Sequence, residues 1–131
     1  CEVDPRRVDR VLNNLLTNAI EHSEGKPVKI AIAENESAVA ITVTDNGIGM
    51  DKNETSKVFY RFWRADPSRK RTTGGTGLGL AIALEDALAH NGKLEVTAEL
   101  GLGSSFRLTI PKRQETEEYE SPLPLTVEKL I

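Results

Sequence analysis

The sequence predicts an α/β (α+β) protein in which helices alternate with pairs of antiparallel strands. Three observations lead to this fold class. Apolar residues recur at helical spacing in two stretches, at about residues 5–23 and 78–90. Elsewhere, apolar residues alternate with polar or small ones, which is typical of strands with one buried face. The chain of 131 residues is long enough for one domain with a single core.

The first helix is predicted to begin at Asp4 and Pro5, because a carboxylate can cap a helix and proline suits the first helical turn. Its apolar stripe consists of Val8, Val11, Leu12, Leu15, Leu16, Ala19 and Ile20. Asn14 and Asn18 are four positions apart and therefore share one edge of that stripe. Asparagine is a mediocre helix former, so we interpret the pair either as polar surface residues or as part of a site.

The next two elements are predicted to form an antiparallel hairpin. Residues 28–32 and 39–45 both alternate apolar with polar or small residues, and Asn35-Glu36-Ser37 supplies the turn between them. The alternation predicts that Ile30 and Ile32 lie on a half-buried face of the first strand.

The second half of the chain repeats this order of helix and strands. A short helix is expected at residues 54–62, and a longer one from Leu78 to about His90, where Asn91-Gly92 forms a C-terminal cap. Two alternating strands follow at residues 94–96 and 106–110, with one buried and one solvated face.

Composition excludes several classes of function. The net charge of -3 argues against nonspecific binding to nucleic acid. No apolar run is long enough to span a membrane, so we do not expect this fragment to be embedded in one. One cysteine cannot form an internal disulfide, and two histidines argue against a multi-histidine metal site. Because the chain starts with Cys1 rather than Met, we interpret it as a piece of a longer protein.

A glycine-rich stretch, Gly75-Thr76-Gly77-Leu78-Gly79, stands directly before the second long helix. Glycine lets backbone N–H groups approach an anion, and the start of a helix adds unpaired donors and the positive end of its dipole. The stretch predicts either a phosphate-binding loop or a plain turn. It lacks the Gly-Lys-Ser/Thr of a Walker loop, and Leu80 stands where the dinucleotide fingerprint requires glycine.

Two further stretches are candidates for ligand contacts. Asp45-Asn46-Gly47-Ile48-Gly49 comes directly off a predicted strand, and its carboxylate could accept a hydrogen bond from an exocyclic amine such as that of adenine. An ordinary Asp-Asn-Gly turn is the alternative. Positive charge also gathers before the glycine-rich stretch, either as a lid over an anion or as a solvated loop. It comes from Arg61, Arg64, Arg69, Lys70 and Arg71.

Taken in order, these motifs resemble the N, first glycine, F and second glycine boxes of sensor histidine kinases. They are Asn14-x-x-x-Asn18, Asp45-x-Gly47-x-Gly49, Phe59-Tyr60-Arg61-Phe62 and Gly75-x-Gly77-x-Gly79. The resemblance is to the catalytic and ATP-binding domain of the GHKL ATPase superfamily and covers residues 4–111. The basic segment around Arg64 is similar to that of actinobacterial cell-envelope sensor kinases of the MtrB type.

This resemblance implies the Bergerat fold, a two-layer α/β sandwich with a mixed, mostly antiparallel sheet and helices on one face. Residues 1–113 would form the catalytic and ATP-binding domain. We expect residues 114–131 to form an acidic tail that is poorly ordered or weakly docked, because residues 114–121 carry a run of glutamates and little that could be buried. The apolar residues that follow could pack against the domain or against a partner, and the sequence leaves both open; they are Leu123, Leu125, Val127, Leu130 and Ile131.

The resemblance also implies roles for individual residues. Asn18 would coordinate Mg²⁺, with Asn14 contacting the metal or its water, and amide oxygens suit this hard cation. The adenine of ATP would lie against Asp45, Gly47, Gly49 and the ring of His22. The phosphates would be held by Gly75, Thr76, Gly77, Leu78 and Gly79, and the γ-phosphate reached by Arg64 and Arg61.

The function implied is transfer of the γ-phosphate of ATP to a histidine on a separate dimerisation domain, and from there to a response-regulator aspartate. ATPases of the superfamily place a glutamate base where this chain has Asn14, so we expect slow hydrolysis. Neither His22 nor His90 resembles a phosphoacceptor, and the chain should bind ATP without phosphorylating itself. The domain would be the cytoplasmic part of a membrane-anchored receptor kinase. Alternatives are an anti-sigma-factor serine kinase and a degenerate interaction module.

Overall fold

The computed structural model describes residues 3–59, 79–113 and 118–126. Its helices and strands are α1 (Pro5–His22), β1 (Val28–Glu34), β2 (Ala38–Asp45), α2 (Lys52–Thr55), α3 (Gly79–Ala89), β3 (Lys93–Glu99) and β4 (Gly103–Pro111). The strands form one sheet in the order β1-β2-β4-β3, and every neighbouring pair is antiparallel. The α/β class, the predicted hairpin and the second pair of strands are confirmed.

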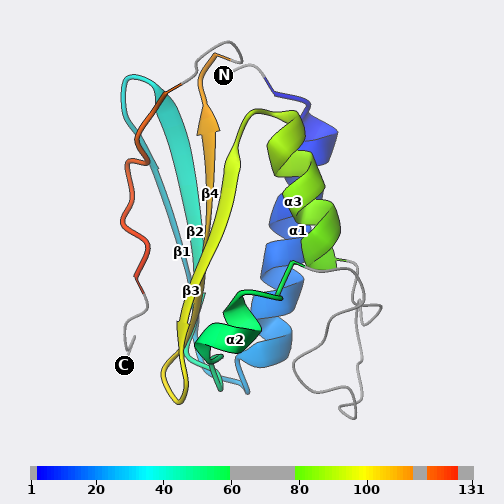
Figure 1. Cartoon of the computed structure of the whole chain (residues 1–131), viewed down its shortest axis with the longest axis vertical. Helices are drawn as coiled ribbons and strands as arrows, with labels where there is room; N and C mark the ends of the chain where they lie inside the picture. The colour runs from blue at the N-terminus through cyan, green and yellow to red at the C-terminus, as the bar shows by residue number, and fades with distance from the viewer. Residues whose placement is uncertain (1–2, 60–78, 114–117, 127–131) are drawn as a thin grey trace.

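The helices cover one face of this sheet, as Figure 1 shows. α1 lies over β2, α3 lies over β3, and the two long helices pack against each other. The core between helices and sheet includes Val11, Leu15, Ala19, Val43, Ala83, Ala87, Leu94, Phe106, Leu108 and Ile110. Residues 118–126 run along the opposite face of the sheet (Figure 1). We call this face the outer face.

α1 begins as predicted, because the Asp4 carboxylate accepts a hydrogen bond from the backbone N–H of Arg6 at 3.0 Å and Pro5 occupies the first turn. The buried residues of its apolar stripe are Val11, Leu15 and Ala19. Ile20 is an exception, since it is 67% exposed. It was expected in the stripe but lies beyond the edge of the contact with the sheet.

α1 and α3 are joined by an ion pair between the exposed guanidinium of Arg10 and the buried carboxylate of Asp86. The guanidinium of Arg10 donates to both carboxylate oxygens of Asp86 at 2.7 Å, and Asp86 is only 2% exposed. At the end of α3, His90 accepts a hydrogen bond on Nε2 from the backbone N–H of Asp4 at 2.8 Å, while Nδ1 lies 2.9 Å from the carbonyl oxygen of Asp86. The two helices are therefore fastened together near the start of α1.

The helix expected at residues 54–62 is shorter and begins earlier. α2 starts at Lys52 because Asp51 and Glu54 form a capping box, in which each side chain accepts a hydrogen bond from the backbone of the other. It ends at Thr55, and residues 60–62 lie outside the described part of the chain.

The prediction that Ile30 and Ile32 lie on a half-buried face of β1 is also wrong. Ile30 is 51% exposed and Ile32 is 70% exposed. They do share a face with the core residue Val43 and the half-buried Ile41 of β2, since Ile30 pairs with Val43 and Ile32 with Ile41. That face is left open at β1 because α1 lies over β2 instead.

Candidate functional site

Three polar residues form a stripe along one edge of α1. Asn14, Asn18 and His22 follow one another at intervals of four and therefore project from the same side of the helix. The stripe is roughly 12 Å long at a rise of about 1.5 Å per residue. The ring of His22 is oriented by Nδ1, which lies 2.8 Å from the carbonyl oxygen of Asn18. All three side chains are partly exposed, so a ligand can reach them.

One end of the stripe meets the carboxylate of Asp45, the last residue of β2. Asp45 is 1% exposed, and its Oδ1 accepts a hydrogen bond from the backbone N–H of Gly47 at 2.9 Å. Its Oδ2 is buried without a hydrogen-bond partner in the described residues. Burial raises the pKa of Asp45, although the hydrogen bond from Gly47 and the nearby His22 oppose that rise.

A buried carboxylate oxygen without a partner is costly, and native proteins usually satisfy such atoms. The free oxygen of Asp45 is therefore suited to a donor that arrives with a ligand. An exocyclic amine on a flat ring is a donor of the right kind.

The glycines after Asp45 are required by close packing against protein backbone. A Cβ atom on Gly47 would lie 1.6 Å from the carbonyl oxygen of His22, so the end of α1 presses directly on this loop. Gly49 has a φ of +73°, and a Cβ there would lie 2.0 Å from the carbonyl oxygen of Glu99. The loop is thereby wedged between α1 and the β3–β4 turn, which fixes it beside the carboxylate of Asp45.

The other end of the α1 stripe meets the start of α3. A Cβ atom on Gly79, the first residue of α3, would lie 3.4 Å from Oδ1 of Asn14. The first N–H groups of this helix, which have no partner within the helix itself, are therefore close to the asparagine side chain, in a position that favours an anion. Other predicted site residues lie outside the described part of the chain. They are Arg61, Arg64, Gly75, Thr76, Gly77 and Leu78.

The structure thus brings the described site residues together along α1. They run from Gly79 and Asn14 through Asn18 to His22, Gly47 and Asp45. Phe59, which belongs to the F motif, instead anchors the core, with its ring packed edge-on against Phe106 at 6.1 Å between centroids. The described residues contain no cluster of three or more His, Cys, Asp or Glu side chains that could hold a metal ion.

Sequence reasoning missed two residues that position Asp45. A Cβ atom on Gly103 would lie 2.0 Å from the carbonyl oxygen of Asp45, and Gly103 has a φ of +131°. The backbone of Ser104 lies near the carboxylate of Asp45 and helps to oppose the rise of its pKa. The signal for them is the Gly101-x-Gly103 pair, which by itself predicts only a turn between strands.

Comparison with known proteins identifies the class to which this arrangement belongs. Residues 3–114 match the model of the histidine kinase-, DNA gyrase B- and HSP90-like ATPases. The mycobacterial sensor histidine kinase MprB has a solved structure that superposes with a TM-score of 0.70 at 31% identity, over 82% of this chain and 72% of that one. The chain therefore belongs to this ATPase family and, within it, to the catalytic domains of sensor histidine kinases.

The individual proteins most similar in sequence include MtrB kinases. The sensor histidine kinase MtrB of Mycolicibacterium paratuberculosis is 57% identical over 124 residues, which is 95% of this chain and 22% of that protein. The sensor protein kinase WalK of Staphylococcus saprophyticus is 42% identical over 113 residues, 84% of this chain and 18% of that protein. The chain thus spans about a fifth of these relatives, and the predicted resemblance to the MtrB type is confirmed.

A further solved relative carries a nucleotide. The structure of full-length ShkA in complex with AMPPNP superposes with a TM-score of 0.69 at 29% identity, over 80% of this chain and 21% of that one.

Within the described residues of the present chain, no helix combines the length and the apolar composition that a membrane span requires.

Proposed function

We propose that this chain binds Mg²⁺-ATP along the polar edge of α1 and presents the γ-phosphate to a histidine on a separate dimerisation domain. The phosphoryl group would then pass to an aspartate of a response regulator. The observation that carries the proposal is Oδ2 of Asp45, which is buried without a hydrogen-bond partner among the described residues at the end of the Asn14–Asn18–His22 stripe. The membership of the chain among histidine kinase catalytic domains supports it.

The adenine belongs at the Asp45 end of the site. Oδ2 of Asp45 accepts a hydrogen bond from the exocyclic amine, while Oδ1 stays occupied by Gly47. The tight loop at Gly47 and Gly49 keeps this carboxylate fixed, so the base is recognised by a rigid acceptor. We assign the ring of His22 to packing against the base, and its orientation through Nδ1 beside the carbonyl oxygen of Asn18 supports this assignment.

The phosphates and the metal belong at the Asn14 end. Amide oxygens of Asn14 and Asn18 fit the oxygen donors that Mg²⁺ prefers, and a cation bound there would neutralise phosphate charge. Gly79 and the loop before it (Gly75 to Leu78) supply backbone N–H groups to the phosphates. Arg64 and Arg61 lie outside the described residues, so their assignment to the γ-phosphate rests on the sequence motif alone.

The identity of residue 14 favours transfer to another protein group over hydrolysis. An amide cannot remove a proton from water, so Asn14 cannot act as a general base. The remaining work is to position ATP and neutralise its charge, which constitutes most of phosphoryl-transfer catalysis. The nucleophile must then come from outside this chain, which fits a phosphoacceptor histidine on the dimerisation domain of a longer, dimeric protein. We place this domain on the cytoplasmic side of a membrane-anchored receptor kinase.

The test is calorimetric titration with ATP in the presence of Mg²⁺, on the native chain and two aspartate variants. Asp45→Ala should lose affinity by tenfold or more, since a hydrogen bond to a charged group is worth about 1.5–3 kcal/mol. Asp9→Ala is the matched control, because Asp9 is an exposed carboxylate on the same helix as the asparagines. If the native chain does not bind ATP, the proposal fails; if Asp45→Ala binds as well as the native chain, the assignment of adenine fails.

A further inference from the structure

The outer face of the sheet is buried although both long helices lie on the other side. Apart from the partly buried Arg107, most outward-facing positions of β2 and β4 carry small side chains that are at most 8% exposed. They are Ala38, Ala40, Thr42, Thr44, Ser105 and Thr109. This face was expected to be solvated. Figure 1 shows that residues 118–126 lie along it, so the domain has three layers in this region.

These residues have the exposure pattern of a strand that faces a surface. Tyr119, Ser121, Leu123 and Leu125 are partly buried, whereas Glu118, Glu120, Pro124 and Thr126 are exposed. Pro122 is the exception, since it is also partly buried and the chain bends at Pro122 and Leu123. At the other positions the alternation means that one side of the segment faces the sheet. Pro122 and Pro124 each fix the backbone angle φ and lack an N–H donor.

Two hydrogen bonds join the middle of the segment to β4. Nη1 of Arg107 donates to the carbonyl oxygen of Leu123 at 2.8 Å, and Oγ1 of Thr109 donates to Oγ of Ser121 at 3.1 Å. The same guanidinium donates through Nη2 to the carboxylate of Glu95 on β3 at 2.7 Å. Arg107 therefore links the segment to two strands at once.

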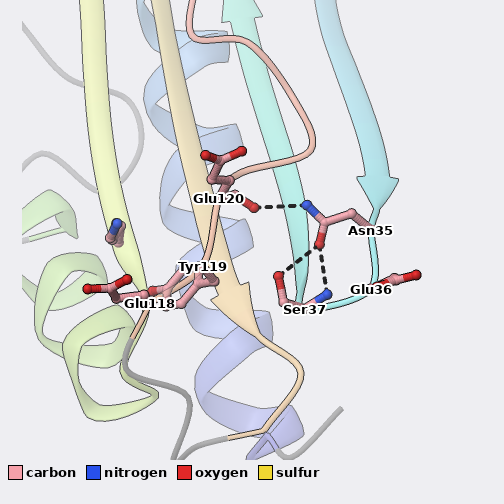
Figure 2. Close-up of a pocket in the computed structure, with 7 residues that line it drawn as sticks. Asn35, Glu36, Ser37, Glu118, Tyr119 and Glu120 are labelled. Atoms are coloured by element: carbon pink, nitrogen blue, oxygen red, sulfur yellow. Dashed lines mark hydrogen bonds between the residues drawn. The ribbon is translucent and has the colours of Figure 1, made fainter.

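The start of the segment is fastened at both sides of an open hollow of about 680 Å³ (Figure 2). On one side, Nδ2 of Asn35 donates to the carbonyl oxygen of Glu120 at 2.9 Å, while Oδ1 accepts from the backbone N–H groups of Ser37 and Ala38. Asn35 thus ties the segment to the β1–β2 turn.

On the other side, the hydroxyl of Tyr119 donates to the carbonyl oxygen of Asn91 at 2.5 Å. The ammonium of Lys93 lies 4.9 Å from the centroid of the same ring. Burial raises the pKa of the Tyr119 hydroxyl, which keeps it protonated as a donor.

The segment lies outside the common core of the family. The family model ends at residue 114. The match to MtrB, in contrast, covers 124 residues of a 131-residue chain and so cannot end before residue 124. The sequence match to MtrB therefore extends into the segment, which lies beyond the residues that the family model matches.

We propose that residues 118–126 are a strap, an intramolecular ligand for the outer face of the sheet that stabilises the domain. The face of small side chains accepts an extended segment with alternate inward residues and prolines. Any protein that uses this face must first displace the strap. The proposal does not depend on nucleotide binding.

The position of the strap can be tested by disulfide trapping in the full chain with Cys1 replaced by serine. Thr109→Cys with Ser121→Cys places two thiols where two hydroxyl oxygens are 3.1 Å apart, so mild oxidation should join them within one chain. Thr109→Cys with Glu120→Cys is the matched control, because Glu120 faces solvent, and it should cross-link at least tenfold more slowly. Equal rates for both pairs, or dimers linked between chains, would overturn the proposal.

The stabilising role is tested by thermal unfolding of two double variants of the full chain. Tyr119→Ala with Leu123→Ala removes inward side chains and should lower the Tm by about 4 °C or more. Glu118→Ala with Glu120→Ala removes only exposed side chains and should leave the Tm within about 1 °C of the native value. Similar shifts for both variants would show that the segment is not a structural layer.

Discussion

At the scale of single residues, the burial of Asp45 serves the proposed recognition of the nucleotide and also lowers the stability of the domain. Its carboxylate is held in place by Gly47, yet one oxygen is buried without a partner in the described residues. Because burial raises the pKa of Asp45, the folded state binds this proton more tightly than the unfolded chain does. The free energy of unfolding therefore falls as the pH rises from about 4, the ordinary pKa of the group, through the raised pKa of the folded state.

We predict that Asp45→Asn gains thermal stability relative to the native chain as the pH increases. The amide keeps an acceptor for the N–H of Gly47 but carries no charge to desolvate. Melting curves at pH 3 and pH 7 should show a larger Tm advantage for the variant at pH 7, together with lost affinity for ATP. An advantage that is the same at both pH values would contradict the assignment of this linkage to Asp45.

Gly47→Ala should destabilise the domain by about 1–3 kcal/mol, the usual cost of forcing extra atoms into a packed site. The added methyl group would meet the backbone carbonyl of His22, which cannot move without disturbing the end of α1. Urea unfolding of this variant is best compared with Ile48→Ala, since Ile48 is the exposed neighbour and its truncation should change stability little. A smaller loss in Gly47→Ala than in the control would show that the loop yields easily.

The roles of these residues differ in how far sequence can predict them. Asp45 follows a strand and precedes two glycines, so a fixed carboxylate is predictable from local order alone. The contact between Gly47 and His22 joins two segments that are distant in sequence. Only the packing of α1 on the sheet determines it.

At the scale of elements, α1 and α3 act as one unit because Arg10 pairs with Asp86. The hydrogen bond and the charge of Arg10 lower the pKa of Asp86. A carboxyl whose pKa is lower in the folded state contributes stability above its ordinary pKa of about 4. That contribution is lost as the pH falls through the lowered value.

Asp86→Asn should therefore be less stable than the native chain at pH 6, and the difference should shrink as the pH falls toward 2.5. Urea unfolding at several pH values across this range measures the difference in the free energy of unfolding. Asp9→Asn is the control: because the carboxylate of Asp9 is exposed, its removal should change the free energy of unfolding by nearly the same small amount at every pH. A gap between Asp86→Asn and the native chain that stays constant with pH would argue that the side chain matters for packing alone.

The errors in the predicted elements have one physical origin. Periodicity identifies which residues share a face, and it did so for β1, where Ile30 and Ile32 do align with buried and half-buried residues of β2. It does not identify which strand a helix will cover. For the same reason the sequence left open whether residues 118–126 pack on the domain, because their alternation has meaning only beside a sheet.

At the scale of the whole molecule, the sheet separates two surfaces. The α1 edge carries the proposed nucleotide site, and the outer face carries the strap (Figure 1). Neither histidine is placed as a phosphoacceptor. His90 is 6% exposed, with one ring nitrogen bonded to the N–H of Asp4 and the other beside the carbonyl oxygen of Asp86. The ring of His22 is held within the last turn of α1.

We predict that the chain alone incorporates no label from γ-labelled ATP. When a dimerisation domain that carries the phosphoacceptor histidine of an MtrB relative is added, that domain should become labelled in proportion to time. The control uses Asp45→Ala, which should abolish labelling of the added domain. Label on the chain itself, at His22 or His90, would refute the assignment of these histidines.

The open side of β1 also has a bearing on how the domain behaves in concentrated solution. In the described sheet β1 is an edge strand, and it displays Ile30 and Ile32 to solvent. Free edges with exposed apolar side chains promote pairing between copies. We therefore expect this strand to promote self-association of the isolated domain, and Ile32→Lys to raise its solubility limit while leaving the residues of the nucleotide site unchanged.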